Sequence, residues 1–239
     1  MDWGDEVWSR MAADSGVTLS GTPVVVVLVA AFVAVAVGPL WGVLRLGVTL
    51  VHELGHALVG IVSGRRFTGF VLRGDMSGHA VTVGPARGPG RVLTTWAGYP
   101  APAVVGAALV TLAVRGWSAP VLTAVLVLLV AALLWVRSVL TAAVVLAVVA
   151  GAGALWWAAP PEVQAQVVVA AGLVLLVGAW RHLATVVSAP RRGTSDPEVL
   201  ARLTRVPTVV WNLTFALACL GASWVAGSTV LRAAGVLSG

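Results

Sequence analysis

The chain has 239 residues, of which 59% are hydrophobic and only 10% are charged, whereas a soluble domain carries about 25% charged residues. This composition, with a mean hydropathy of +0.98, excludes a soluble enzyme and indicates an integral membrane protein. All 15 basic residues are arginines at scattered positions rather than in a stripe, which argues against a nucleic-acid partner, and the single cysteine excludes a disulfide framework and a cysteine-rich zinc site.

The apolar segments, taken in chain order, predict a bundle of membrane-spanning helices. Residues 1–21 form an acidic, amphipathic stretch without the basic start and apolar run of a signal peptide. A spanning helix needs about 20 mostly apolar residues, and seven segments come close to this length: 22–38, 40–62, 92–114, 119–136, 138–157, 163–188 and 208–231. Their apolar runs are continuous rather than alternating, which favours helices over a membrane β-barrel. We predict one all-α polytopic domain over residues 1–239, with six to seven transmembrane helices.

The distribution of arginines predicts the orientation of these segments. If the N-terminus is cytoplasmic, the loops 63–91 and 189–207 and the turn at Arg137 lie on the same side and carry most of the arginines. Only Arg115 and Arg232 lie on the other side. Because cytoplasmic loops of membrane proteins are enriched in arginine, we expect these two loops to be cytoplasmic.

The second segment contains the sequence HELGH at residues 52–56. On a helix, His52 and His56 share a face, so both imidazoles can reach one metal ion, and Glu53 can reach a water molecule there. Zinc metallopeptidases use this arrangement of two histidine ligands and a glutamate general base. The alternative is a chance match, or histidines that hydrogen-bond between helices. Ionisable groups at bilayer depth cost about 2.5–3.5 kcal/mol each, however, and usually have a function. Gly55 would let another helix approach closely.

A catalytic zinc site needs a third protein ligand, and the chain has only nine acidic residues. HELGH lies in the half of its segment nearer the 63–91 loop, on the side predicted to be cytoplasmic. Asp196 lies in the 189–207 loop, which is predicted on the same side. In the sequence SDPE, however, Asp196 could cap a helix that starts at Pro197, or Ser195 and Glu198 could form a capping box. Sequence alone leaves these interpretations open. Other candidates on this side are Asp75, Glu198, His79 and His182, the last of which could instead make a buried polar contact.

Residues 65–83 read RRFTGFVLRGDMSGHAVTV, two short runs rich in β-branched and aromatic residues around the sequence RGDMSG. This pattern predicts a β-hairpin. An isolated hairpin is marginally stable in water, so we expect it to pack against the helices. The alternative is an ordinary solvated loop.

Four stretches resemble the site-2 protease-like intramembrane zinc metallopeptidases, and most closely their short bacterial branch, which is common in actinobacteria and lacks a PDZ or CBS domain. They are HELGHALVGIVSGRR, RGDMSGHAVTV, AGYPAP at 97–102 and SDPEVLARLTRVPTVVW at 195–211. The resemblance implies that Asp196 corresponds to the distal metal-binding aspartate of the family. One departure is that better-known members carry this aspartate in a Leu-Asp-Gly setting inside a transmembrane helix, after an Asn-Pro that is missing here.

The resemblance also implies that the hairpin is re-entrant and that its open edge binds an extended substrate by strand addition. We assign this contact to Phe70, Val71 and Leu72. Asn212, at the start of the last segment, is a candidate polar partner near the site, although a hydrogen bond between helices would explain it equally well.

The function implied by the resemblance is that of a zinc endopeptidase in the bacterial cytoplasmic membrane, with its active site toward the cytoplasm and a membrane protein as substrate. One Zn²⁺ per chain would be held by His52, His56 and Asp196, and Glu53 would be the general base. The alternative is a non-proteolytic zinc-binding membrane scaffold or sensor. A metal transporter is disfavoured, because the spans hold few ionisable residues besides HELGH and Arg181–His182. The lipid bilayer is an expected partner, and the sequence does not indicate an oligomeric state.

Overall fold

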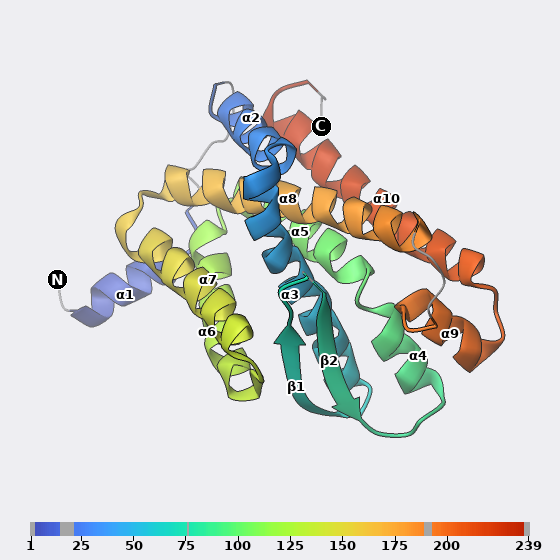
Figure 1. Cartoon of the computed structure of the whole chain (residues 1–239). Helices are drawn as coiled ribbons and strands as arrows, with labels where there is room; N and C mark the ends of the chain where they lie inside the picture. Colours follow the sequence, from blue (N-terminus) through green and yellow to red (C-terminus); the bar gives the residue numbers. More distant parts are fainter. Residues whose placement is uncertain (1–2, 15–21, 76, 189–192, 237–239) are drawn as a thin grey trace.

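A computed structural model describes residues 3–14, 22–75, 77–188 and 193–236. Helices dominate this part of the chain (Figure 1). In chain order the elements are α1 (Trp3–Met11), α2 (Thr22–Ala36), α3 (Gly38–Val62), β1 (Arg66–Leu72), β2 (Gly78–Val83), α4 (Pro89–Trp96), α5 (Pro100–Val114), α6 (Ser118–Ala132), the 3₁₀ turn η1 (Leu133–Trp135), α7 (Val139–Ala158), α8 (Pro161–Ser188), α9 (Asp196–Thr204) and α10 (Thr208–Ala233).

Five of the described helical segments are long and apolar enough to cross a membrane: α3, α6 with η1, α7, α8 and α10. The predicted segment 92–114 forms a sixth candidate, but it is broken into α4 and α5, whose axes differ by 61°. The second of these helices, α5, begins at Pro100. Proline has no N–H, so it cannot donate the hydrogen bond that would continue α4. The prediction of an all-α polytopic membrane protein with a small hairpin is therefore confirmed, with five or six candidate spans.

The segments 22–38 and 40–62 do not form two antiparallel spans, and this part of the prediction is wrong. Only Val37, in extended conformation (φ −79°, ψ 111°), separates α2 from α3, and α2 lies at the end of α3 rather than along its side (Figure 1). The cause is Pro39, which cannot donate the helical hydrogen bond to the carbonyl of Val35. Arg181 of α8 donates to that carbonyl instead, at 3.1 Å, and its guanidinium lies 4.2 Å from the centre of the Trp41 ring.

As a consequence, α1 lies at the end of the bundle opposite the hairpin. Arg10 donates to the carbonyl of Trp157, and the N–H of Asp14 donates to the carbonyl of Gly116 at 2.8 Å. Trp157 is at the far end of α7, whereas Ser138 at its near end contacts β1. The 20 residues of α7 separate these ends by about 30 Å. The expectation that the N-terminal segment and the loop after α3 share a side is therefore wrong.

The centre of the bundle is α8: of its 18 most apolar consecutive residues 56% are buried, whereas in α7 the share is only 11%, so α7 presents most of its surface outward. The most extensive contact of α8 is with α5. A Cβ on Gly106 would lie 2.5 Å from the carbonyl oxygen of Gly172, and a Cβ on Gly172 would lie 2.6 Å from that of Gly106. Small residues at a crossing let two helical backbones meet in this way.

The predicted hairpin forms between α3 and α4. Its strands are antiparallel, with Phe70 opposite Ala80 and Leu72 opposite Gly78. The inward side chains of β1 belong to a buried cluster with residues of α3, α6 and α7, and Phe70 and Leu72 are 0% and 1% exposed. The interpretation of this region as a solvated loop is therefore wrong.

Candidate metal centre

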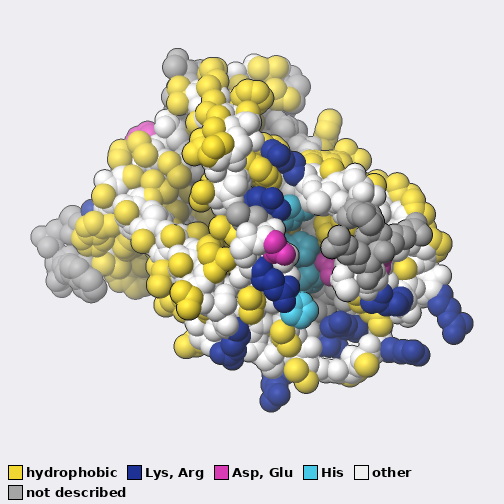
Figure 2. All heavy atoms as spheres, in the orientation of Figure 1, with side chains coloured by type: hydrophobic (Ala, Val, Ile, Leu, Met, Phe, Trp, Pro, Cys, Tyr) yellow, Lys and Arg dark blue, Asp and Glu magenta, His cyan; other side chains and the backbone are white. Residues whose placement is uncertain are grey.

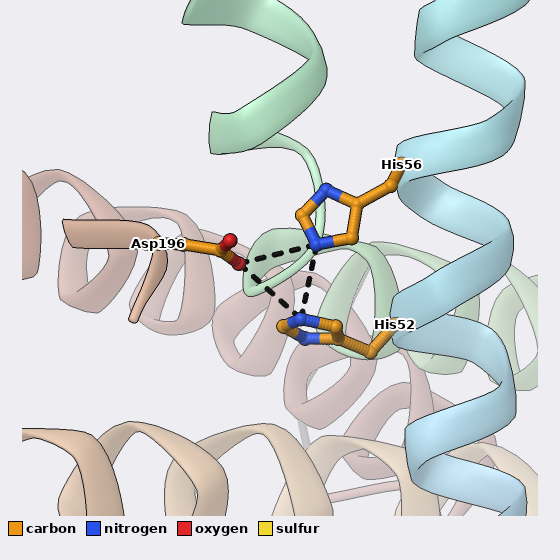
Figure 3. Close-up of side chains that lie close together, drawn as sticks. All are labelled: His52, His56 and Asp196. Carbon is orange, nitrogen blue, oxygen red and sulfur yellow. Dashed lines mark hydrogen bonds and ion pairs between the residues drawn. The ribbon is translucent and has the colours of Figure 1, made fainter. Parts of the chain in front are cut away.

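Three candidate metal ligands converge on one point (Figure 3). His52 and His56 project from the same face of α3, and Asp196 projects toward them from the first turn of α9. The two histidine Nε2 atoms are 3.2 Å apart. The Oδ2 atom of Asp196 lies 3.3 Å from Nε2 of His52 and 3.1 Å from Nε2 of His56. The three atoms thus form a nearly equilateral triangle.

The triangle has the dimensions of a tetrahedral zinc site. Zinc bonds of about 2.0–2.1 Å separate neighbouring ligand atoms by about 3.3 Å. Without a cation, lone pairs of two imidazoles and a carboxylate would face one another, so the donor set calls for a positive charge. Two histidines and one carboxylate are also the ligands of catalytic sites, which keep a fourth position for water or substrate. The three side chains are 13%, 11% and 20% exposed, and on the face shown in Figure 2 histidines form a recessed column.

The orientation of each histidine has a separate cause. Nδ1 of His56 lies 2.7 Å from the carbonyl oxygen of Thr94 in α4. A carbonyl only accepts, so Nδ1 carries the proton and Nε2 presents its lone pair to the shared point. The His52 ring meets the Tyr99 ring edge to face at 4.9 Å, and Tyr99 is stacked on Phe215 at 5.0 Å. Residues of the AGYPAP motif and of α10 therefore support the first histidine.

The structure separates the two interpretations of the sequence SDPE. Ser195 is the N-cap of α9, and it forms a capping box with Glu198. The Glu198 carboxylate accepts from the Ser195 hydroxyl at 2.6 Å and from the N–H of Gly193 at 3.0 Å. These hydrogen bonds lower the pKa of the Glu198 carboxyl to about 2. Asp196 is the next residue and is not the cap, so its carboxylate is free to face the histidines.

Two glycines give the site its shape. A Cβ on Gly98 would lie 2.3 Å from Nε2 of His56 and 2.7 Å from Nε2 of His52. Residue 98 therefore must be glycine to leave space in front of the ligand atoms. A Cβ on Gly55 would lie 2.4 Å from Cβ of Ala101, which confirms the close approach predicted for this glycine. The AGYPAP motif contained Gly98, but nothing in the sequence indicated this role.

Glu53 is the only buried acidic residue of α3 and is 4% exposed. Its carboxylate does not belong to the ligand triangle and faces the start of β2. A Cβ on Gly78 would lie 2.4 Å from Oε1 of Glu53, so the strand backbone passes directly over this carboxylate. The hairpin is thereby placed at the candidate site.

Two other predicted polar residues lie outside the triangle. The ring of His182, on α8, is centred 6.2 Å from that of His52. Asn212 is the fifth residue of α10, and its Oδ1 atom is buried without a hydrogen-bond partner among the described residues. A role of Asn212 toward the substrate stays a prediction.

The two remaining candidates belong to the hairpin. Asp75 is exposed in its turn, where Oδ1 accepts from the hydroxyl of Ser77 at 2.6 Å and from its N–H at 3.0 Å. These bonds lower the pKa of the Asp75 carboxyl. His79 is exposed on β2. Neither side chain is part of the ligand cluster, so both are turn or surface residues of the hairpin.

The outer edge of β1 is closed. The carbonyl of Phe70 accepts from the N–H of Arg137 at 3.1 Å, and the N–H of Leu72 donates to Oγ1 of Thr141 at 2.7 Å. The assignment of strand addition to Phe70, Val71 and Leu72 therefore needs correction, because α7 and the turn before it already occupy that edge. Since alternate residues of an antiparallel pair point their backbone groups outward, Gly78 and Ala80, opposite Leu72 and Phe70, carry the outward groups of β2.

Comparisons with known proteins give one match. The family model described as peptidase M50B-like matches residues 25–226. No curated protein and no solved structure gives a significant match. Peptidases of the M50 family are zinc-dependent membrane enzymes, and the His/His/Asp cluster lies within the matched region. The chain therefore belongs to the peptidase M50B-like, site-2 protease-like family of membrane metallopeptidases.

Proposed function

We propose that the chain is an intramembrane zinc endopeptidase that cleaves transmembrane or membrane-tethered proteins. The observation that carries the proposal is the triangle of His52 Nε2, His56 Nε2 and Asp196 Oδ2, with edges of 3.1–3.3 Å. These three residues would hold one Zn²⁺. Zinc in such a site supplies an acidified water molecule and polarises a carbonyl group.

Glu53 is the general base in this proposal. It follows the first histidine directly in the chain, so it lies next to the ligand triangle without belonging to it. Its carboxylate is buried beneath Gly78, where a peptide carbonyl held by β2 would arrive. Glu53 would take the proton from the attacking water and pass it to the leaving amine.

The substrate would be held in extended form along β2. The outward N–H and C=O groups of Gly78 and Ala80 lie at the start of this strand, beside Glu53. Strand addition supplies these groups with partners and unwinds a substrate helix, which a protease must do before a peptide bond can be attacked. The arginine-rich loops at this end of the bundle favour an active site toward the cytoplasm of a bacterial cell.

Replacement of Glu53 by Gln tests the mechanism. The variant Glu53→Gln should bind zinc as the wild type does and lose cleavage of a transmembrane substrate by about 10²–10⁴-fold, the usual contribution of a general base. Glu162→Gln, an exposed change at the far end of α8, is the matched control. Cleavage retained by Glu53→Gln would refute the mechanism. A wild-type protein that binds zinc without any cleavage would favour the scaffold alternative.

Replacement of Asp196 by Asn tests the ligand set. The amide side chain of Asp196→Asn would keep the shape of the carboxylate but lose the anionic oxygen, so zinc content measured by mass spectrometry should fall. Asp5→Asn, on α1 at the opposite end of the bundle, is the control for an acidic residue outside the site. Equal zinc affinity of Asp196→Asn and the wild type would exclude Asp196 as a ligand.

A further inference from the structure

Besides α3 and β2, strand β1 has another neighbour: the connection between α6 and α7. Residues 135–141, from the end of η1 through this connection into the first turn of α7, run along β1, and Val136 forms a parallel bridge with Phe70. The backbone N–H of Arg137 donates to Phe70 at 3.1 Å. The sheet therefore has two named strands but three backbone segments side by side, with β1 in the middle.

The side chain of Arg137 reinforces this contact. Its Nη2 and Nε atoms donate to the carbonyl oxygen of Thr68 at 2.8 and 3.2 Å. Gly69 allows the approach, because a Cβ there would lie 2.6 Å from Cγ of Arg137 and 2.9 Å from the carbonyl oxygen of Trp135. The arginine that marks the turn between two spans is thus bound to the backbone of a strand.

A buried hydroxyl completes the attachment. Thr141 is 0% exposed, and its Oγ1 atom accepts from the N–H of Leu72 at 2.7 Å. The same oxygen lies 2.7 Å from Oγ of Ser138, the N-cap of α7. Leu72 is directly opposite Gly78 in the register, and Gly78 lies against Glu53. The start of α7 is therefore connected to the candidate catalytic base through one pair of residues in the sheet.

We propose that Arg137 and Thr141 are positioning residues for the substrate: they close the β1 edge and fix the β2 edge beside Glu53, so that an extended peptide binds at Gly78 and Ala80. This inference rests on the proposed endopeptidase function. Neither residue touches the ligand triangle. Their loss should affect the fit of the substrate strand and leave the metal centre intact.

The variant Thr141→Val separates positioning from a structural role. It keeps the volume of the side chain and leaves the N–H of Leu72 without its acceptor. For a transmembrane substrate we expect KM to rise about tenfold, which corresponds to about 1.4 kcal/mol, with kcat within about twofold of wild type and zinc content unchanged. Thr141→Ser, which keeps the hydroxyl, should restore KM.

Thr123→Val is the matched control, because Thr123 lies on α6 and its hydroxyl donates only to the carbonyl of Ala119 in its own helix. Arg137→Ala is a second test at an exposed position, in case Thr141→Val fails to fold, and it should raise KM in the same way. Wild-type KM in both Arg137→Ala and Thr141→Val would overturn the inference, as would equal effects of Thr141→Val and Thr123→Val. Absence of cleavage by the wild type would instead overturn the proposed function.

Discussion

Replacement of Gly98 by alanine is the sharpest test of the candidate metal centre. The added Cβ would lie 2.3 Å from Nε2 of His56, 2.4 Å from Cε1 of the same ring and 2.7 Å from Nε2 of His52. Carbon atoms in contact prefer separations of about 3.5–4.0 Å, so at least one ring must move by about 1 Å. The methyl group would also occupy the space in front of the ligand atoms.

The surroundings of His56 restrict this movement. Its Nδ1 atom is bound to the carbonyl of Thr94 at 2.7 Å, and α3 is in close contact with α5 at Gly55 and Ala101. Overpacking of a fitted site costs about 1–3 kcal/mol, which corresponds to roughly a 5- to 150-fold higher zinc Kd. The proposed reaction requires the bound ion, so cleavage should fall at least as far as zinc affinity.

Zinc titration of the detergent-purified protein against a competing chelator would measure this effect. Gly47→Ala is the matched control, because Gly47 is also in α3 and a Cβ there would have no atom within 4 Å. The control should keep the zinc affinity and cleavage of the wild type. If Gly98→Ala binds zinc as tightly as Gly47→Ala does, the ion is not held at the triangle of His52, His56 and Asp196.

Three further substitutions test the support of the site. Gly55→Ala should separate α3 from α5, because its Cβ would lie 2.4 Å from that of Ala101. We expect the free energy of unfolding to fall by about 1–3 kcal/mol, which would be seen as a lower Tm than that of Gly47→Ala. Phe215→Ala removes a fully buried ring and should lower the free energy of unfolding by about 3–5 kcal/mol. Because the Phe215 ring stacks on the Tyr99 ring, which contacts the ring of His52, zinc affinity should fall as well as Tm. Ser195→Ala removes the cap of α9 at a cost of about 0.5–2 kcal/mol, and the zinc Kd should rise while the hydrogen-bonded register of the hairpin, followed by hydrogen exchange, stays unchanged.

The local part of the site could be predicted because it depends only on the helical period. Four residues separate His52 from His56, and any helix through them brings the two rings to one face. Asp196 is 140 positions further along the chain, and only the fold brings it to the histidines. The small number of acidic residues made it the best candidate, but the letters SDPE are equally compatible with a cap, a ligand or both. Side-chain geometry was needed to assign the cap to Ser195.

The path of α2 into α3 was missed for a different reason. Counting apolar residues finds segments of suitable length but not the direction of the chain. One signal was present: antiparallel helices usually need connections of 2–8 residues, and the predicted segments 22–38 and 40–62 left a single residue between them. Together with Pro39, this spacing favours a bend over a reversal, and a bend changes the side on which the N-terminal segment lies.

The backbone contacts at the site could not be predicted at all. The sequence indicated a hairpin, but a strand has two edges, and their occupation depends on what else lies beside them. The turn at Arg137 was identified only as a connection between spans, and its hydrogen bonds to β1 follow from the packing of α6 and α7. Gly78 and Gly98 were likewise two glycines among 27, distinguished only by the side chains that face them.

The start of α9 shows how one short sequence can meet two demands. A helix N-terminus attracts carboxylates, because its free N–H groups and its dipole carry partial positive charge. If Asp196 were the cap, the same oxygens would be required both by the helix and by the proposed metal ion. Ser195 and Glu198 satisfy the helix instead, and Pro197 needs no partner because it has no N–H. The carboxylate of Asp196 is thereby held in place by a capped helix whose own hydrogen bonds do not compete for it, which is the arrangement that a permanent metal ligand requires.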